Sequence, residues 1–214
     1  MEFDFRTLAP QDRYKLLIGT VVPRPIALVT TREENGAANA APFSFFNVMS
    51  HDPAMLVLGI EQRHDRSPKD TVRNIRRTRE FVVNMVDEAI AAAMNVCAID
   101  FPDRTDELKE AGLTAAASMA IDTPRIAESP VNFECRLLDE LRYGDAGKRS
   151  IVVGEILHVH VRDDVLEPSL RVDQSKLQLV GRLAGAGYVH LSDRFEIPRI
   201  SVEEWQQRKA GVAK

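Results

Sequence analysis

The feature that most constrains the fold is an Asn35-Gly36 pair that follows a β-rich stretch. That stretch, RPIALVTT at residues 24–31, has the composition of a strand and opens on a proline, as strands often can. Asn-Gly is a strong signal for a tight hairpin, because both central residues of a type I′ turn have positive φ. The sequence therefore predicts an antiparallel hairpin that pairs residues 24–31 with the stretch that begins at Asn39.

This second stretch, NAAPFSFFNVMS at residues 39–50, lacks the pattern of an ordinary strand. A wholly buried strand is a near-continuous run of Val, Ile and Leu, and a half-buried strand alternates apolar and polar residues. Pro42 in addition removes a ladder hydrogen bond, which restricts the segment to an edge, a bulge or a bend. Two interpretations stay open here: a distorted edge strand, or a segment whose backbone meets a ligand.

Strands and short helices follow in the middle of the chain. AMLVLGIE (54–61) and EFVVNMV (80–86) are strand-like, and residues 67–78 carry apolar positions at helical spacing. The alanine-rich residues 87–98 predict a further helix, as do residues 105–112, which end on a plausible C-terminal glycine.

The second half returns to β structure in two long segments, residues 129–141 and 149–163. Long strands early and late, with helices between them, predict a mainly β fold: one closed antiparallel barrel with helical excursions, and not a βαβ sheet. With no repeat, linker or low-complexity segment, we expect one domain over residues 1–214 with a short N-terminal arm and a C-terminal tail. In the last segment, the face expected to be apolar carries Ile151, Val153, Leu157, Val159 and Val161, interrupted by Glu155.

Composition excludes several classes of protein. With 214 residues, 44% hydrophobic and 28% charged, the chain is typical of a soluble globular protein, and its net charge of −4 argues against nucleic acid as a partner. No apolar run approaches the roughly 18 residues of a membrane span. The N-terminus is acidic where a secretory signal is basic, so we expect a cytoplasmic protein. Cys97 and Cys135 are expected to be buried free thiols.

The start of the helix at residues 67–78 has the features of an anion site. Ser67 is expected to cap it, with Pro68 in the first helical position and Asp70 completing a capping box. Free N–H groups and the positive end of the helix dipole favour a phosphate, to which Lys69 adds a charge and Thr71 a hydroxyl donor. The alternative is a well-capped helix without a ligand.

Other motifs carry little chemistry. His158 and His160 share one strand face and could hold a metal, but no third ligand is apparent in the sequence, so no metal site is predicted. GAGYVH at residues 185–190 lacks the third glycine and the βαβ context of a dinucleotide fingerprint. No acid–base cluster is visible and no catalytic residue is assigned, so the chemistry of an enzyme of this kind belongs to a cofactor.

Taken together, the segments resemble the flavin reductase-like family of FMN-binding split barrels. The resemblance runs over about residues 10–200 and rests on RPIALVTT, NG, NAAPFSFFNVMSHDP, KDTVRNIRRTREFVVNMVDE, IAESPVNFECRL, VVGEILHVHVRDD and VGRLAGAGY, in that order. It implies a split β-barrel homodimer with flavin near the subunit interface. The family includes NAD(P)H:flavin oxidoreductases, reductase components of two-component monooxygenases, and flavoproteins of unassigned substrate.

The resemblance also implies a set of cofactor-binding residues. Two threonines would face the flavin, the irregular strand would run along its ring, and the helix start would hold its phosphate. Two residues of VGRLAGAGY would line the open face where nicotinamide stacks. Some family members carry a histidine near this motif that is implicated in nicotinamide use, and His190 is not assigned to that role. The implied set is Thr30, Thr31, Asn39, Ala41, Pro42, Phe43, Ser44, Asn47, Lys69, Asp70, Thr71, Arg182 and Tyr188.

The implied activity is that of an NAD(P)H-dependent flavin reductase. NADH or NADPH would deliver a hydride to N5 of bound FMN, with FAD as an alternative flavin, and the electrons would pass to a monooxygenase component or to oxygen. Two alternatives stay open: an FMN-binding flavoprotein with another donor or a specific organic substrate, and a non-catalytic flavin-binding or sensing module. Neither nucleic acid nor a membrane is an expected partner.

Overall fold

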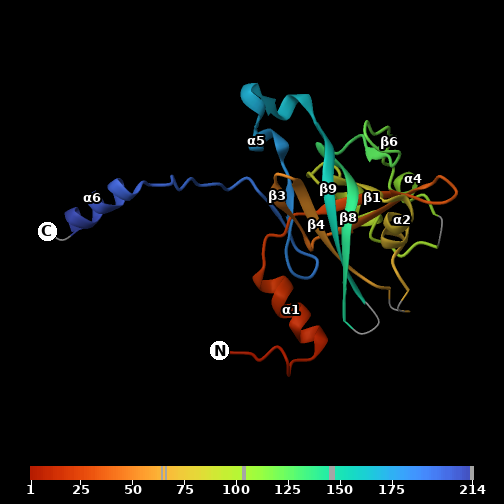
Figure 1. The fold of residues 1–214 in the computed structure, drawn as a ribbon, viewed down its shortest axis with the longest axis horizontal. Coiled ribbons are helices and arrows are strands. Elements are labelled where there is room, and N and C mark those ends of the chain that lie inside the picture. The colour runs from red at the N-terminus through yellow and green to blue at the C-terminus, as the bar shows by residue number, and fades with distance from the viewer. Residues whose placement is uncertain (64, 66, 103–104, 145–147, 213–214) are drawn as a thin grey trace.

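The computed structural model describes residues 1–63, 65, 67–102, 105–144 and 148–212, and its centre is a seven-stranded sheet (Figure 1). Neighbouring strands are antiparallel throughout, in the order β2-β1-β5-β8-β9-β4-β3. The strands are β1 (Ala27–Arg32), β2 (Ala38–Phe43), β3 (Phe46–His51), β4 (Ala54–Glu61), β5 (Glu80–Met85), β8 (Val131–Tyr143) and β9 (Arg149–Val161).

Helices and short strands surround this sheet. The helices are α1 (Pro10–Thr20), α2 (Asp70–Thr78), α3 (Ala91–Val96), α4 (Glu107–Glu110), α5 (Gln174–Leu177) and α6 (Val202–Val212), with 3₁₀ turns η2 (Asp163–Val165) and η3 (Pro168–Leu170). The short strands pair as β6 (Ala115–Ala116) with β7 (Arg125–Ile126), β10 (Leu166–Glu167) with β11 (Arg171–Val172), and β12 (Val180–Arg182) with β13 (Tyr188–His190). Within the described residues, no helix is long and apolar enough to span a bilayer.

The predicted hairpin is confirmed, but its turn is not of type I′. β1 pairs with β2 so that Thr31 lies opposite Asn39. Gly36 has a φ of 86°, whereas Asn35 does not adopt a positive φ. The loop runs over residues 33–37, longer than a two-residue turn, and Asn35 Oδ1 accepts a hydrogen bond from the Ala37 N–H instead.

The barrel closes where the two edges of the sheet meet. β2 and β3 are the edge strands, yet only Ser44 and Phe45 lie between them in sequence. The Gly59 N–H of β4 donates to the Phe45 carbonyl at 2.7 Å, and a Cβ on Gly59 would come within 3.0 Å of Phe45 Cβ. The prediction that Pro42 lies at an edge or bend is confirmed, because it stands in edge strand β2 near this closure.

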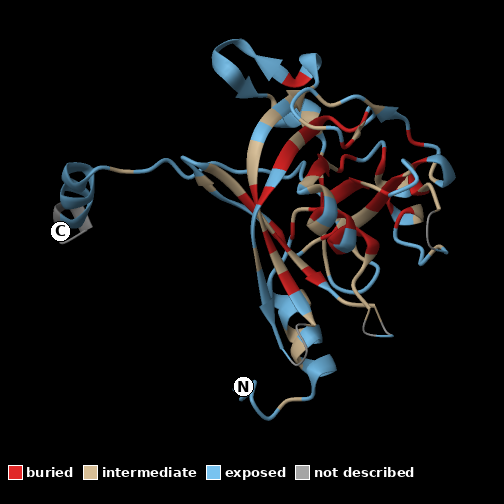
Figure 2. Ribbon diagram, turned by 45° about the vertical axis from the view of Figure 1, so that its right-hand side comes forward, coloured by how far each residue is buried: buried red, intermediate tan, exposed pale blue. Residues whose placement is uncertain are grey.

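Two apolar clusters line the two sides of the sheet. One lies inside the barrel, where Phe81 packs so closely over Gly154 that a Cβ there would lie 2.4 Å from the ring. The other lies outside the barrel, where Leu28 and Leu108 are buried. Figure 2 shows the buried residues concentrated in the sheet and the elements that cover it.

Helix α2 forms as predicted but starts later and without the expected cap. It begins at Asp70, so Lys69 is the N-cap, and no side chain caps it. Ser67 Oγ donates instead to Asp65 Oδ1 at 2.6 Å, and the Asp70 carboxylate pairs with Arg63 and Arg73 rather than with a backbone N–H. The capping-box prediction is therefore wrong, because the helix starts two residues later than predicted and neither Ser67 nor Asp70 stands at the required position.

The predicted face of β9 is wrong because a β-bulge reverses the side-chain alternation. Glu134 pairs with His158 and Cys135 with Ile156, so Leu157 has no partner on β8. Before the bulge, Val152 and Gly154 face the core while Ile151 is only partly buried. After it, the two histidines lie on the same face as Glu134, a neighbour that the sequence did not reveal.

The other predicted helices are present but shorter, whereas α1 and α6 form where only an N-terminal arm and a C-terminal tail were expected. α3 and α4 are shorter than the predicted helices, and the predicted C-terminal glycine, Gly112, has a φ of 67°. Cys97 and Cys135 are buried free thiols, as expected. At the C-terminus an extended segment carries α6 away from the barrel (Figures 1 and 2), and it leaves Phe195 and Ile197 84% and 82% exposed.

Candidate functional site

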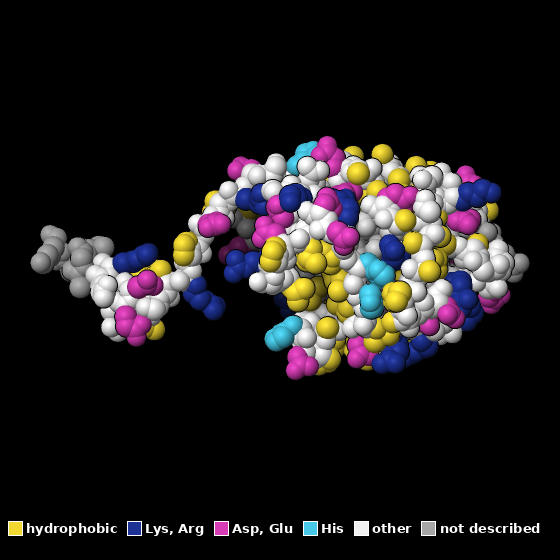
Figure 3. Space-filling model, turned by 90° about the horizontal axis from the view of Figure 1, so that it is seen from above, with side chains coloured by type: hydrophobic (Ala, Val, Ile, Leu, Met, Phe, Trp, Pro, Cys, Tyr) yellow, Lys and Arg dark blue, Asp and Glu magenta, His cyan; other side chains and the backbone are white. Residues whose placement is uncertain are grey.

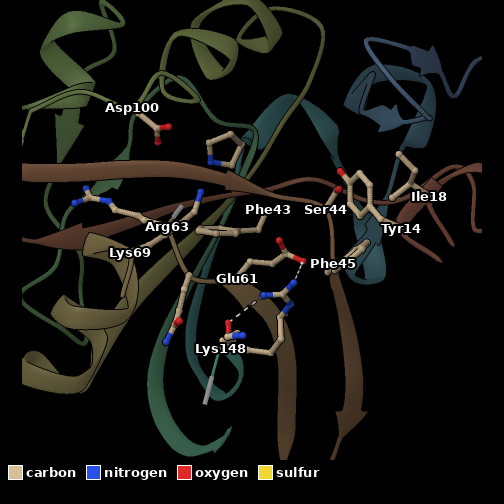
Figure 4. Close-up of a pocket in the computed structure, with 14 residues that line it drawn as sticks. Tyr14, Ile18, Phe43, Ser44, Phe45, Glu61, Arg63, Lys69, Asp100 and Lys148 are labelled. Carbon is tan, nitrogen blue, oxygen red and sulfur yellow. Dashed lines mark hydrogen bonds and ion pairs between the residues drawn. The ribbon is translucent and has the colours of Figure 1, made fainter. Parts of the chain in front are cut away.

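A cavity of about 580 Å³ opens beside the closure of the barrel (Figure 4). Pro42, Phe43 and Phe45 give it an apolar wall, and Tyr14 of α1 lies beside Ser44 and Phe45 (Figure 4). Charged side chains complete the lining. Its charged residues are Glu61, Arg63, Lys69, Asp100, Lys148 and Arg149.

A second cavity, of about 100 Å³, adjoins the first at the start of α2. The two share Pro42, Arg63, Lys69 and Asp100, so β2 runs past both of them. The smaller cavity is lined further by Asn39, Ala41, Asp70, Thr71 and Glu107, and by the segment that follows α3.

A buried polar network fixes β2 at the base of the smaller cavity. Asn39 is only 4% exposed, and its Oδ1 accepts hydrogen bonds from the hydroxyls of Thr31, at 3.0 Å, and Thr71, at 3.2 Å. Its Nδ2 donates to Glu107 Oε1 at 3.0 Å, and the Ala40 N–H donates to Glu107 Oε2 at 3.2 Å. Both amide atoms of Asn39 are thus engaged, which sets the position of the strand relative to α2 and α4.

Glu107 and Cys97 are the buried ionisable groups of this region. Burial raises the pKa of Glu107 despite its hydrogen bonds from Asn39 and Ala40. Burial, with the nearby Glu107 carboxylate, raises the pKa of the Cys97 thiol to about 12. The Cys97 thiol therefore stays protonated at neutral pH and is not an activated nucleophile.

The start of α2 favours an anion. Lys69 lines both cavities, with Nζ 5.9 Å from the centre of the Phe43 ring, and no side chain caps the helix. The first N–H groups of an uncapped helix carry partial positive charge. Arg63 also lines both cavities and forms an ion pair with Asp70. This pairing offsets the negative charge that the Asp70 carboxylate brings to the helix start.

Most of the residues implied by the resemblance meet at these two cavities. Thr31 lies behind them and acts through its hydrogen bond to Asn39, not as a lining residue. Ser44 lines the larger cavity and accepts a hydrogen bond from Arg24 Nε at 3.3 Å. The implied residues that line one or both cavities are Asn39, Ala41, Pro42, Phe43, Ser44, Lys69, Asp70 and Thr71.

Four implied residues lie elsewhere. Thr30 is fully buried and donates to the Pro124 carbonyl at 2.6 Å. Asn47 Oδ1 accepts a hydrogen bond from the Val48 N–H at 2.8 Å, and Asn47 lines a separate apolar cavity. Arg182 places its guanidinium 4.5 Å from the centre of the Tyr188 ring, and neither of them lines the two cavities.

Sequence reasoning missed several lining residues. Arg63 could have been predicted, because it is a cation only a few positions before the start of α2, where an anion site was expected. Tyr14, Lys148 and Arg149 come from α1 and the start of β9, far from β2 in sequence. The Arg149 guanidinium reaches Glu61 on β4 at 3.0 Å, a contact that exists only because β4 and β9 pair.

Comparisons with known proteins agree with this architecture. A family model described as "Flavin reductase like domain" matches residues 18–181. An uncharacterized protein from Aquifex aeolicus is 41% identical over 189 residues, which are 88% of this chain and 95% of that protein.

Two solved structures extend the comparison. Nitrilotriacetate monooxygenase component B from Bacillus cereus is 31% identical, with a TM-score of 0.88 over 92% of this chain and 98% of that one. The 2-nitrobenzoate 2-nitroreductase from Pseudomonas fluorescens is 36% identical, with a TM-score of 0.86 over 94% of this chain and 98% of that one.

Proposed function

The chain belongs to the flavin reductase-like domain family, and on this basis we propose that it is a flavin-dependent oxidoreductase acting as an NAD(P)H:FMN reductase. The observation that carries the proposal is one continuous strand, β2, that passes an apolar wall in the larger cavity and reaches the cationic start of α2 in the smaller one. FMN has the matching layout, a flat ring at one end and a phosphate at the other.

The residues at the smaller cavity fit the phosphate. Lys69 supplies a full charge and the uncapped first turn of α2 a set of backbone donors, while the hydroxyl proton of Thr71, which lines the same cavity, is donated to Asn39. Charge-assisted hydrogen bonds contribute about 1.5–3 kcal/mol each and neutral ones about 1 kcal/mol, so tight retention needs several of them together. Arg63 lies where it adds a second cation.

The residues at the larger cavity fit the ring. A volume of about 580 Å³ lies within the usual range for a cofactor site, and Pro42 and Phe43 provide apolar surface. The Ala40 N–H points away from β1, to the free edge of β2, where it donates to Glu107. Because N–H groups alternate in direction along an antiparallel strand, an N–H at position 42 would point to the same free edge. The proline at this position therefore removes no hydrogen bond between β1 and β2. Ser44 adds a hydroxyl at the ring end.

When bound, FMN supplies the redox chemistry, accepting a hydride from NAD(P)H and passing electrons to an acceptor. The chain binds the phosphate through α2 and keeps β2 in place through Asn39 and Glu107. Donors preorganised along the ring stabilise charge that develops there. No side chain is assigned as a general acid or base.

Two kinds of electron acceptor are compatible with the proposed reductase. The likeness to a monooxygenase component B supports a reductase that serves a partner monooxygenase or oxygen. The likeness to a 2-nitrobenzoate 2-nitroreductase, at 36% identity, favours as second candidate the reduction of a specific organic substrate such as a nitroaromatic. A flavin-binding module without catalysis is the third possibility that the experiments separate.

We propose further that the protein is a homodimer with flavin near the interface. The C-terminal segment supports this, because it leaves the barrel and exposes large apolar side chains to water. Such side chains are usually covered by a partner, and a second copy of the chain provides one.

The activity is tested by titrating the purified protein with FMN and then mixing it anaerobically with NADH or NADPH. We expect quenching of flavin fluorescence, a higher melting temperature, and bleaching of flavin absorbance by one or both nucleotides. Binding without bleaching by either nucleotide would remove the reductase assignment. Flavin reduced with dithionite and then mixed anaerobically with 2-nitrobenzoate tests the second candidate, for which we expect reoxidation of the flavin. A protein that shows neither quenching nor stabilisation by saturating FMN contradicts the whole proposal.

A further inference from the structure

A second cluster of polar side chains lies on the outer face of the sheet, on β8 and β9. Glu134 pairs with His158 across the two strands, and His160 follows two residues later on the same face. The rings of His158 and His160 lie 4.7 Å apart, and Figure 3 shows adjoining histidine side chains among hydrophobic ones. None of the three residues lines either cavity of the proposed flavin site.

We propose that Glu134, His158 and His160 bind a divalent transition metal ion of the zinc class, with water in the fourth position. Their nearest ligand atoms all lie within 4.8 Å of one another. Two imidazoles and one carboxylate with an open position are a common donor set for such an ion.

The distances suit an ion after a small adjustment. His158 Nδ1 lies 3.9 Å from Glu134 Oε1, and His160 Nε2 lies 2.6 Å from the same oxygen. Metal–ligand bonds of about 2.0–2.1 Å in a tetrahedral site place ligand atoms roughly 3.3 Å apart. Of these two gaps to Glu134, one must therefore close and the other open by about 0.6 to 0.7 Å, and the histidine nitrogens, within 4.8 Å of each other, must settle at the same spacing. The ion displaces the proton between His160 and Glu134.

The carboxylate is held in position by the loop that covers it. Glu134 is fully buried, and its two oxygens accept hydrogen bonds from the backbone N–H groups of Met119, at 2.8 Å, and Ala120, at 2.6 Å. Each carboxylate oxygen can accept a further bond, so these contacts orient the group without saturating it. Carboxylates that bind metals are typically oriented in this way by surrounding donors.

The unpartnered atom of His158 points to a ligand. Its Nδ1 is buried and has no hydrogen-bond partner among the residues that the structure describes. A purely structural hydrogen bond between His160 and Glu134 explains those two residues but leaves this nitrogen unpaired beside a buried carboxylate. The side chains of His158 and His160 are 41% and 21% exposed, which gives an ion and its water a route from solvent.

The donor set also selects among ions. Imidazole nitrogen suits zinc, cobalt, nickel and copper, whereas magnesium and calcium prefer oxygen ligands. We therefore expect Zn²⁺ to bind and Mg²⁺ not to compete with it. The inference stands independently of the proposed flavin chemistry.

The test is equilibrium dialysis of the full-length protein against Zn²⁺ alone, with metal content and melting temperature measured. We expect about one high-affinity equivalent of Zn²⁺ per chain that millimolar Mg²⁺ does not displace, together with a rise in melting temperature. His158→Gln and His160→Gln should each weaken binding at least tenfold. Glu134 is buried, so Glu134→Gln can disturb folding. The test therefore relies on the histidine variants, because these side chains are partly exposed and their substitution should leave the fold intact.

His190→Gln is the matched control. His190 Nδ1 lies 3.6 Å from Glu88 Oε2, so it offers an exposed histidine–carboxylate pair without the second histidine. Its substitution should leave the tight equivalent unchanged. The proposal is wrong if the wild-type protein holds no tight equivalent, or if His158→Gln binds Zn²⁺ as well as the wild type does.

Discussion

The hydroxyl of Thr71, in the first turn of α2, donates a 3.2 Å hydrogen bond to Asn39 Oδ1 on β2. This contact joins the proposed phosphate end of the site to the strand along the ring. Thr71→Val keeps the shape and removes the donor, so we expect a loss of about 0.5–1.5 kcal/mol in the free energy of unfolding and weaker FMN binding. Denaturant unfolding and fluorescence titration measure both quantities. Thr7→Val, which alters an exposed hydroxyl near the N-terminus, is the control and should change neither.

Lys69 is predicted to contact the phosphate and not the ring. Lys69→Ala should weaken FMN binding by about 10- to 100-fold, the loss of one charge-assisted hydrogen bond, while riboflavin, which has no phosphate, should bind as before. Fluorescence titration with the two flavins measures the difference. Equal losses for both flavins would place Lys69 at the ring or in the fold instead. Lys176→Ala, at an exposed lysine on α5, serves as the control.

Glu140 should make the free energy of unfolding depend on pH in the acid range. Its hydrogen bonds with Arg76, and further ones with Ser150 and Arg142, lower its pKa to about 2. Because the folded-state pKa lies below the ordinary value, the stabilisation is fully present above about pH 4.5 and is lost as the pH falls towards 2. Allowing for solvent screening, Glu140→Gln should cost about 1–3 kcal/mol at pH 7.

The pH series supplies its own control for Glu140. Chemical unfolding of wild type and Glu140→Gln between pH 7 and pH 2 should give curves that converge at the acid end. A difference that stays constant over this range would mean that the substitution acts through packing and not through charge.

Gly154 is predicted to be intolerant of a side chain. Gly154→Ala would put a Cβ 2.4 Å from the ring of Phe81, so we expect a loss of about 1–3 kcal/mol in the free energy of unfolding. Gly19→Ala in α1 is the matched control, since nothing lies within 4 Å of its added Cβ and the helix gains up to about 1 kcal/mol. Thermal unfolding of both variants checks the prediction, and similar melting temperatures would contradict it.

The C-terminal segment is predicted to hold a second copy of the chain. Phe195→Ser combined with Ile197→Ser should shift the protein from dimer to monomer, because burying each of these side chains stabilises an interface by about 1.5–3 kcal/mol. Sedimentation over a range of concentrations measures the shift. Leu170→Ser, at a position as exposed as Phe195 but in η3, between β10 and β11, should leave the dimer intact. A wild-type protein that sediments as a monomer contradicts the prediction.

The sequence predicted what local patterns determine. The strand at residues 54–61 matches β4, the hairpin pairs as expected, and the helix that carries Lys69 lies against β2. These elements follow from periodicity and turn residues within a few positions of one another. The closed antiparallel barrel was predictable because no βαβ pattern competes with it.

What the sequence could not show depends on pairing between distant segments. The bulge at Leu157 arises only when β9 lies against β8, and it changes which residues share a face with Glu134. Likewise Arg149 reaches the larger cavity through the pairing of β9 with β4. Ser67 failed as a cap because α2 begins at Asp70 with Lys69 as the N-cap, which leaves Ser67 two residues outside the cap position.

The edges of the sheet protect the protein from aggregation. An exposed edge strand presents free N–H groups to which another chain can add a strand. On β2 the Ala40 N–H is bound by Glu107 and Pro42 has none, while on β3 the Val48 N–H is bound by the side chain of Asn47. Within the irregular stretch, the Ala40, Pro42 and Val48 positions therefore offer a second chain no free N–H group.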